Sequence, residues 1–172
     1  NFTPASCSSN NGTATGTVMV KDINPDSAGS TPYSFVNVNG TVYFAAYGGL
    51  WKSDGTLDGT ILIKNISSWN LTNVNGTLFF TADDGIYGSE LWKSNGTDSG
   101  TVLVKDIGIG SASSNPSFLT DINGTLYFGA DDGMSVHGNE LWKSDGTESG
   151  TVIVKDISPI NGGIPRVLNL TN

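Results

Sequence analysis

The sequence has little cysteine, little histidine and little basic charge. Its 172 residues include one cysteine, one histidine, and 8 Lys plus Arg against 16 Asp plus Glu. The lone Cys7 excludes an internal disulfide framework and is interpreted as a small core residue. His137 cannot form a metal site alone and is interpreted as a loop residue. The net charge of −8 argues against nucleic acid as a partner, because nucleic-acid binding needs a basic surface.

Long hydrophobic runs are missing as well. No apolar run approaches 18 residues, so we expect no insertion into a membrane. The glycines punctuate turns and do not form a phosphate-binding loop. The acidic residues recur at regular intervals, whereas catalytic residues normally occur once, so we expect a protein that is not an enzyme. The chain begins at Asn1 without a Met, and we expect it to be processed or a fragment.

One eighteen-residue phrase occurs in four versions. It reads "SCSSNNGTATGTVMVKDI" at 6–23, "GLWKSDGTLDGTILIKNI" at 49–66, "ELWKSNGTDSGTVLVKDI" at 90–107 and "ELWKSDGTESGTVIVKDI" at 140–157. A second phrase, of the type "LTNVNGTLFFTA", lies between these copies at 35–46, 71–82 and 119–130. Recurrence at a period of 41 to 50 residues indicates an array of structural repeats.

Each repeat divides into four short predicted strands. In the second phrase, two apolar runs flank Asn-Gly, the strongest short-range signal for a hairpin turn. The first phrase supplies another hairpin, from "ELWKS" through a loop to "TVLVKDI". We therefore predict an all-β fold of tandem four-stranded antiparallel blades, β-propeller-like, with an incomplete blade at each chain end. The single array, 1–172, divides into a partial repeat (6–23), repeat 1 (24–66), repeat 2 (67–107), repeat 3 (108–157) and a partial repeat (158–172).

The apolar runs are continuous and do not alternate with polar residues. Neighbouring residues of a strand point to opposite faces, so adjacent apolar residues such as Leu91 and Trp92 require cover on both faces of the sheet. Blades packed face to face provide that cover. We predict an inter-blade core made of the recurring aromatic residues Trp51, Trp92, Trp142, Phe44, Phe80 and Phe128.

The two phrases also carry a family resemblance. "ELWKSDGT", preceded by "NGTLYFGADDG", resembles the ELWxxDGT repeats of large secreted bacterial proteins, and the resemblance covers about 6–172. It implies β-propeller-like blades and a secreted, extracellular setting. It implies no particular activity, because the family has no single assigned one. The first copy departs from the pattern, since Cys7 and Ser8 stand where the other copies have Leu and Trp.

The chain ends carry parts of repeats. The stretch 6–23 supplies only a second hairpin, and 164–172 aligns with 115–123 as the first strand of a further repeat. Unpaired strand edges favour further pairing. The two parts could close a four-blade ring within one chain or complete a blade between two chains. We favour the second, with an inter-chain strand formed by Val167, Leu168, Asn169 and Leu170; such a head-to-tail contact produces a ring or a filament.

The charged residues follow the repeat. Every lysine comes either after Trp or before Asp or Asn, so we interpret the lysines as structural partners of the neighbouring Asp. The acids are present together in repeats 2 and 3 and absent together from repeat 1, which suggests that they face one another. Such carboxylates could hold Ca²⁺; alternatively, they accept hydrogen bonds from turn N–H groups. The candidate residues are Asp83, Asp84, Glu90, Asp131, Asp132 and Glu140.

Nine Asn-X-Ser/Thr patterns are candidate glycosylation sites: Asn1, Asn11, Asn39, Asn65, Asn70, Asn75, Asn95, Asn123 and Asn169. Asn-Gly-Thr is also turn chemistry, which accounts for part of this number. These features favour an extracellular structural protein whose partners are copies of itself, assembled head-to-tail into a glycosylated fibre. The alternative is a lectin-like propeller with one carbohydrate or ligand site per repeat.

Overall fold

The computed structural model of the chain describes residues 16–25, 29–133 and 138–157. They form three antiparallel sheets of four strands, each built from consecutive strands. Sheet 1 comprises β1 (Tyr33–Val38), β2 (Thr41–Ala46), β3 (Gly49–Ser53) and β4 (Ile61–Lys64). Sheet 2 comprises β5 (Ser67–Val74), β6 (Thr77–Asp83), β7 (Ser89–Ser94) and β8 (Thr101–Lys105). Sheet 3 comprises β9 (Ser117–Ile122), β10 (Thr125–Asp131), β11 (Asn139–Ser144) and β12 (Val152–Lys155).

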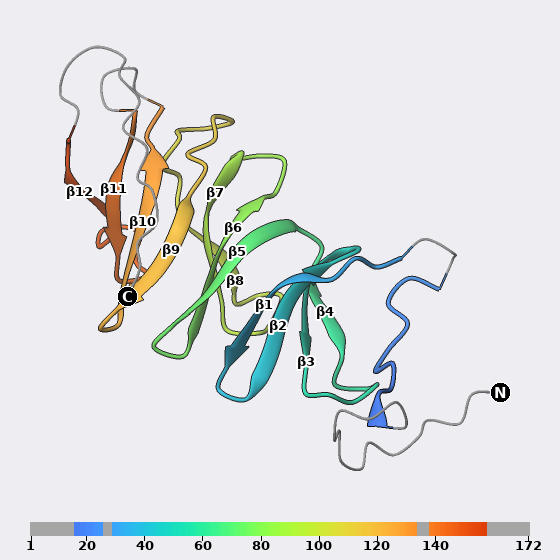
Figure 1. The fold of residues 1–172 in the computed structure, drawn as a ribbon. Helices are drawn as coiled ribbons and strands as arrows, with labels where there is room; N and C mark the ends of the chain where they lie inside the picture. Colours follow the sequence, from blue (N-terminus) through green and yellow to red (C-terminus); the bar gives the residue numbers. More distant parts are fainter. Residues whose placement is uncertain (1–15, 26–28, 134–137, 158–172) are drawn as a thin grey trace.

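The sheets lie side by side in one row, and sheet 2 is between the other two (Figure 1). Each sheet falls inside one predicted repeat, so the prediction of tandem four-stranded antiparallel sheets is confirmed. The first strands of neighbouring sheets are tied together directly. Asn73 Nδ2 donates to the carbonyl of Asn37 at 2.9 Å, and Thr72 Oγ1 donates to that of Leu119 at 3.3 Å.

The Asn-Gly pairs make the first hairpin of each sheet. Asn75 and Gly76 both have positive φ, 48° and 82°, and the other two pairs have similar angles. Two successive residues with positive φ define the type I′ turn, whose twist matches that of the strands that it joins. The Asn73 side chain accepts a hydrogen bond from Gly76 N at 2.9 Å and closes the turn.

The repeated Ser-Asp-Gly-Thr phrase builds the loop of the second hairpin. In sheet 1, Asp54 Oδ1 accepts hydrogen bonds from Thr56 N and Thr56 Oγ1, at 2.9 and 2.7 Å. Thr60 Oγ1 then donates to the carbonyl of Thr56 at 2.6 Å. The same bonds recur in sheets 2 and 3, with Asn95 in the place of aspartate in sheet 2. The loop is therefore held by its own side chains.

These hydrogen bonds also affect the acids in the loop. The side-chain and backbone hydrogen bonds from Thr56 lower the pKa of Asp54, and those from Thr147 lower the pKa of Asp145.

Gly59 is required at the end of the loop, because a Cβ there would overlap the Asp54 carboxylate. The repetition of the phrase thus preserves one loop conformation in every sheet.

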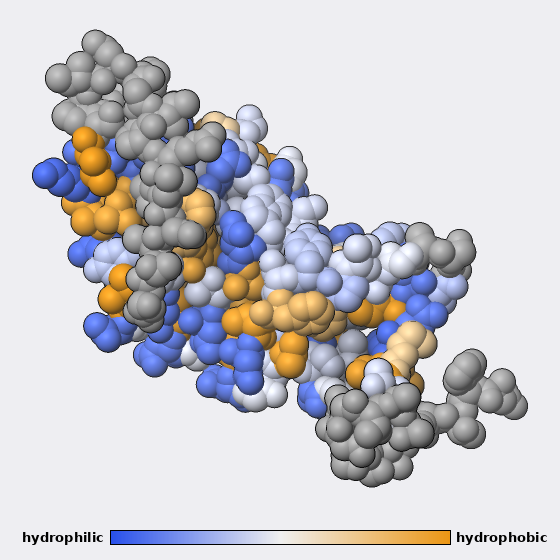
Figure 2. Space-filling model, in the orientation of Figure 1, coloured by the Kyte–Doolittle hydropathy of each residue, from blue (hydrophilic) through white to orange (hydrophobic). Residues whose placement is uncertain are grey.

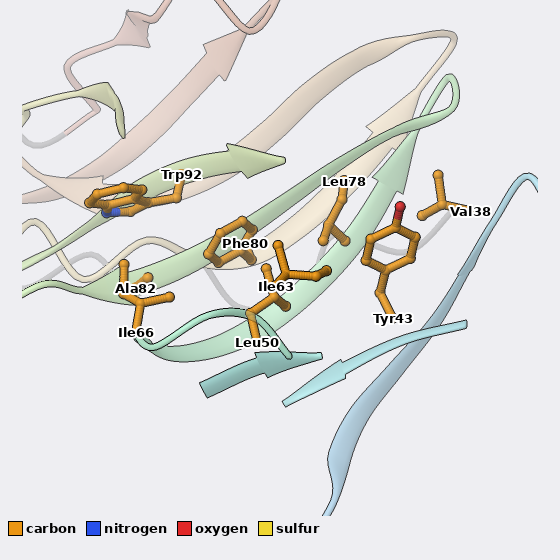
Figure 3. Close-up of a cluster of buried hydrophobic side chains, with 9 residues drawn as sticks. All are labelled: Val38, Tyr43, Leu50, Ile63, Ile66, Leu78, Phe80, Ala82 and Trp92. Carbon is orange, nitrogen blue, oxygen red and sulfur yellow. The ribbon is translucent and has the colours of Figure 1, made fainter. Parts of the chain in front are cut away.

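Two apolar clusters separate the three sheets. Between sheets 1 and 2 lie Val38, Tyr43, Leu50, Ile63, Ile66, Leu78, Phe80, Ala82 and Trp92 (Figure 3). Between sheets 2 and 3 lie Val74, Phe79, Leu91, Val104, Ile107, Leu126, Phe128, Ala130 and Trp142. Leu91 and Trp92 belong to different clusters, as their opposite orientations require.

The recurring aromatic residues form cross-strand pairs. Phe80 is opposite Trp92 and Phe128 is opposite Trp142, and all four side chains are buried between sheets. Phe44 and Trp51 are also opposite each other, but they belong to neither cluster. For this third pair the inter-blade position remains a prediction, because no four-stranded sheet precedes sheet 1 in the described part of the chain.

We predict that Gly96→Ala destabilises the protein more than Gly55→Ala. Both glycines occupy the same loop position with φ near +90°, so both substitutions introduce backbone strain of about 1–2 kcal/mol. A Cβ at Gly96 would also overlap the Tyr43 hydroxyl of the preceding sheet, whereas nothing lies within 4 Å at Gly55. Overpacking of this kind costs about 1–3 kcal/mol more. Urea unfolding of the two variants measures the difference; equal losses would contradict the inter-sheet contact.

Candidate functional site: the contacts between sheets and the two end faces

Lysines connect each sheet to the next one. Lys52 Nζ of sheet 1 donates to the carbonyl of Gly96 in sheet 2 at 2.8 Å. Lys93 Nζ of sheet 2 makes the same contact with the carbonyl of Gly146 in sheet 3, also at 2.8 Å. The two bonds join corresponding positions of successive repeats.

The lysines that precede Asp or Asn make a second series of contacts. Lys105 Nζ donates to the carbonyl of Thr151 at 2.8 Å, and Lys21 Nζ donates to that of Thr60 at 2.7 Å. Lys64 forms an ion pair with Asp98 at 2.9 Å. The expectation of neighbouring aspartates as partners was wrong for these lysines, because each binds a group from the following repeat.

The two faces of a sheet differ consistently. We call the face that carries these lysines the lysine face, and the opposite one, which carries the recurring Trp and Phe, the tryptophan face. At both internal interfaces the lysine face of one sheet packs on the tryptophan face of the next sheet. A small polar cleft opens at the second interface, where Phe79, Lys93 and Asp145 are among its lining residues.

Five apolar positions of the lysine face are buried in sheets 1 and 2. They are Val38, Tyr43, Leu50, Ile63 and Ile66 in sheet 1, and Val74, Phe79, Leu91, Val104 and Ile107 in sheet 2. In sheet 3 the matching positions are Ile122, Tyr127, Leu141, Val154 and Ile157, of which Val154 is 43% exposed and Ile157 is 54% exposed. Figure 2 shows hydrophobic surface at this end of the molecule, near β12.

The lysines of sheet 3 follow the same pattern. Lys143 and Lys155 match Lys93 and Lys105, but both are exposed, and neither makes a hydrogen bond or ion pair within the described ranges. The lysine face of sheet 3 therefore carries the groups that make the inter-sheet contacts elsewhere, but no further sheet follows it within 16–25, 29–133 and 138–157.

Glu90 holds the linker between sheets 2 and 3. Its side chain is fully buried, and its carboxylate accepts hydrogen bonds from Ile107 N, Gly108 N and Ser114 N at 2.9 to 3.0 Å. Ser114 Oγ donates a fourth, at 2.6 Å. Glu140 is also fully buried and accepts from Ile157 N at 2.9 Å. Four donors partly compensate the burial of the Glu90 charge, which would otherwise be strongly unfavourable.

Gly49 takes the place of this glutamate in sheet 1. A Cβ at Gly49 would overlap the carbonyl of Lys64 and lie 2.8 Å from Ile66 N, so no side chain fits there. Only residues 65–66 separate β4 from β5, whereas residues 106–116 separate β8 from β9. The glutamate therefore accompanies the long linker, because its carboxylate binds the additional backbone N–H groups.

The structure does not place the candidate acids opposite one another. Ala82 pairs with Glu90 and Asp83 pairs with Ser89, so Asp83 and Glu90 point to opposite faces of sheet 2. The same register separates Asp131 from Glu140 in sheet 3. The interpretation that these acids face one another was wrong, since Glu90 binds the linker after β8 on the other face of the sheet.

The aspartates close their own turns. Asp83 Oδ1 accepts from Gly85 N at 2.8 Å, and Asp84 Oδ1 accepts from Ile86 N and Tyr87 N at 2.9 and 3.0 Å. Asp131 Oδ1 accepts from Gly133 N at 2.9 Å. Asp132 also has an interaction partner. Across the ranges that the structure describes, no three or more His, Cys, Asp or Glu side chains gather in a position to hold a metal ion, so the calcium interpretation gains no support.

The structure describes six of the nine candidate glycosylation sites. All six are exposed: Asn39, Asn65, Asn70, Asn75, Asn95 and Asn123. Asn70 Nδ2 already donates to the carbonyl of Pro116 at 3.2 Å. Several predictions lie outside the described residues, namely those for Asn1, Asn11, Asn169, Cys7, His137, Val167, Leu168 and Leu170.

Sequence reasoning missed the acceptors of the lysines. These are the carbonyls of Gly96, Gly146, Thr60 and Thr151, all in the repeated loop. The sequence did contain a signal for these acceptors, because lysine, glycine and threonine recur together with the same spacing. Comparisons with family models, curated proteins and solved structures found no match. No helix in the described part of the chain is long and apolar enough to cross a membrane.

We predict that Lys93→Met lowers the free energy of unfolding by about 1.5–3 kcal/mol, the usual contribution of a hydrogen bond to a charged group. Methionine keeps the length of the side chain but cannot donate to the carbonyl of Gly146. The matched control is Lys143→Met, which changes an exposed side chain and should alter the stability of the monomer by less than about 0.5 kcal/mol. Urea unfolding at low protein concentration tests both, and equal effects would contradict the inter-sheet role of Lys93.

We also predict that Glu90→Gln destabilises the fold by at least about 2 kcal/mol at neutral pH, because an NH₂ group then faces backbone donors. Burial raises the pKa of Glu90 from its ordinary value of 4.5, although the hydrogen bond from Ser114 and those from the linker lower it. The stabilising effect of Glu90 is therefore complete below the unfolded pKa and decreases as the pH rises through the folded pKa.

The difference in stability between the wild type and Glu90→Gln should accordingly be larger near pH 4.5 than at neutral pH. Urea unfolding of both proteins across this interval measures it. A difference that instead grows with rising pH would show that the folded protein lowers the pKa of Glu90.

Proposed function

We propose that this protein is an extracellular structural protein whose molecules assemble head-to-tail through blades completed between chains. The observation that carries the proposal is the lysine face of sheet 3. Its apolar positions are buried at both internal interfaces but largely uncovered here, as Val154 and Ile157 illustrate. Burying one apolar side chain is worth about 1.5–3 kcal/mol, so covering this face supplies a driving force for association.

The tryptophan face of sheet 1, at the opposite end of the row, is only partly covered. On the tryptophan face of sheet 1, Phe35 is 61% exposed and Leu62 is 41% exposed. Their counterparts pack against the internal clusters: Leu71 and Leu119 match Phe35, and Leu103 and Ile153 match Leu62. A lysine face and a tryptophan face are the two surfaces that join inside the molecule, so the two ends of one chain are complementary.

The arrangement of the sheets favours contact between molecules. Residues 16–25 lie beside sheet 1, at the opposite end of the row from β12 (Figure 1). A head-to-tail contact between such ends is heterologous, and it continues into a filament unless its rotation closes a ring. Closure of a four-blade propeller within one chain is the competing arrangement. The exposure of the described acceptor asparagines is compatible with the glycans of the proposed fibre.

We predict that Val154→Glu abolishes assembly, whereas Val152→Glu leaves it intact. Both valines are in β12 and are similarly exposed, at 43% and 37%. The counterparts of Val154, Ile63 and Val104, are buried, but the counterparts of Val152 remain 38 to 42% exposed in complete sheets. Only a charge at Val154 would therefore be buried by the next molecule.

Analytical ultracentrifugation and electron microscopy measure the assembly of the wild type and of the two variants. The wild type and Val152→Glu should form concentration-dependent chains, and Val154→Glu should remain monomeric. Wild-type protein that stays monomeric at high concentration would refute the proposal, as would assembly that both substitutions affect equally. The intact mass of protein from its native source shows whether the asparagines carry glycans.

A further inference from the structure

Segment 17–23 occupies the place of a fourth strand in front of sheet 1. Its sequence, "TVMVKDI", matches that of β8 and β12. Lys21 Nζ donates to the carbonyl of Thr60 at 2.7 Å, just as Lys105 Nζ of β8 donates to that of Thr151 at 2.8 Å. Lys21 therefore makes the contact with sheet 1 that the last lysine of a preceding sheet would make, while Val20, the counterpart of the buried Ile63, remains 40% exposed.

The opposite side of this segment is open. Thr17 is exposed, whereas its counterparts Thr60, Thr101 and Thr151 are at most 3% exposed. Met19 is 76% exposed, whereas its counterparts Leu103 and Ile153 pack against the clusters between sheets. In the complete sheets this is the side that receives the lysine face of the preceding sheet.

Sheet 3 offers the matching surface. Lys155 is at the position of Lys105 and Lys21, whose amines bind the threonine carbonyl of the next repeat. Lys155 itself is exposed and makes no hydrogen bond within 16–25, 29–133 and 138–157. Val154, beside it, is 43% exposed on the same strand.

We propose that Lys155 of one molecule donates to the main-chain carbonyl of Thr17 in a second copy of the chain, with Met19 of that copy packed against the lysine face of sheet 3. The molecule already makes this bond twice at the corresponding positions, from Lys105 to Thr151 and from Lys21 to Thr60. Within one molecule, β12 and residues 17–23 lie at opposite ends of the row of sheets (Figure 1). The partner of Lys155 is therefore residues 17–23 of a second copy. This inference rests on the proposed head-to-tail assembly and specifies its register.

Cysteine crosslinking between two populations of molecules tests the register. In a Cys7→Ser background, one population carries Thr17→Cys and the other carries Lys155→Cys; they are assembled together and treated with a short bismaleimide. A single chain with Lys64→Cys and Asp98→Cys is the positive control, because these side chains meet across the interface of sheets 1 and 2 at 2.9 Å and are both accessible. A mixture of Thr17→Cys with Lys52→Cys is the negative control, because Lys52 is engaged inside the molecule at 2.8 Å from the carbonyl of Gly96.

The expected result is a covalent dimer from Thr17→Cys with Lys155→Cys and none from the negative control. Assembly without this dimer would overturn the register and leave the head-to-tail proposal standing. A chain with both substitutions that crosslinks only within itself, as a monomer, would show a closed ring and overturn both proposals. The absence of any assembly would also overturn both.

Discussion

The structure depends on the packing of two different sheet faces against each other. Each sheet contains adjacent apolar residues, such as Leu91 and Trp92, that point to opposite faces and are both buried. A four-stranded sheet has no means of covering both faces itself, so its stability comes from the sheets on either side. Every sheet presents one face of each kind, and among the three sheets that the structure describes, sheet 2 has both faces covered by complete sheets.

Polar contacts determine the order and the register of the stack. A hydrophobic face alone would tolerate several packing offsets, but a lysine amine that reaches one carbonyl does not. Lys52 and Lys93 select the same glycine carbonyl of the following loop, and the hydrogen bonds of that loop keep the carbonyl in place. Glu90 then holds the linker that carries the chain from sheet 2 to sheet 3. The lysines and the loop are repeated at both interfaces, whereas the glutamate accompanies the long linker and is replaced by Gly49 in sheet 1.

The strands, the Asn-Gly hairpins and the face-to-face packing of the sheets were predicted from the sequence, since they follow from local periodicity and turn chemistry. It did not predict the partners of the lysines, because Lys105 binds Thr151, 46 residues away, rather than its neighbour Asp106. The glutamates were interpreted as facing the aspartates because both vary together between repeats. The unequal repeat lengths held the correct signal, since the glutamate occurs where residues 106–116 form a long linker and glycine occurs where residues 65–66 form a short one.

The central claim is that a sheet of this kind is completed only by a neighbour, and that the lysine face of sheet 3 receives such a neighbour from another molecule. Cryo-electron microscopy of the assembled protein, at a resolution that traces the backbone, tests it most directly. The account predicts that the backbone of a second molecule, including its residues 17–23, covers Val154 and Ile157. A reconstruction in which that face is open to solvent, or is covered by residues 17–23 of the same molecule, would contradict it.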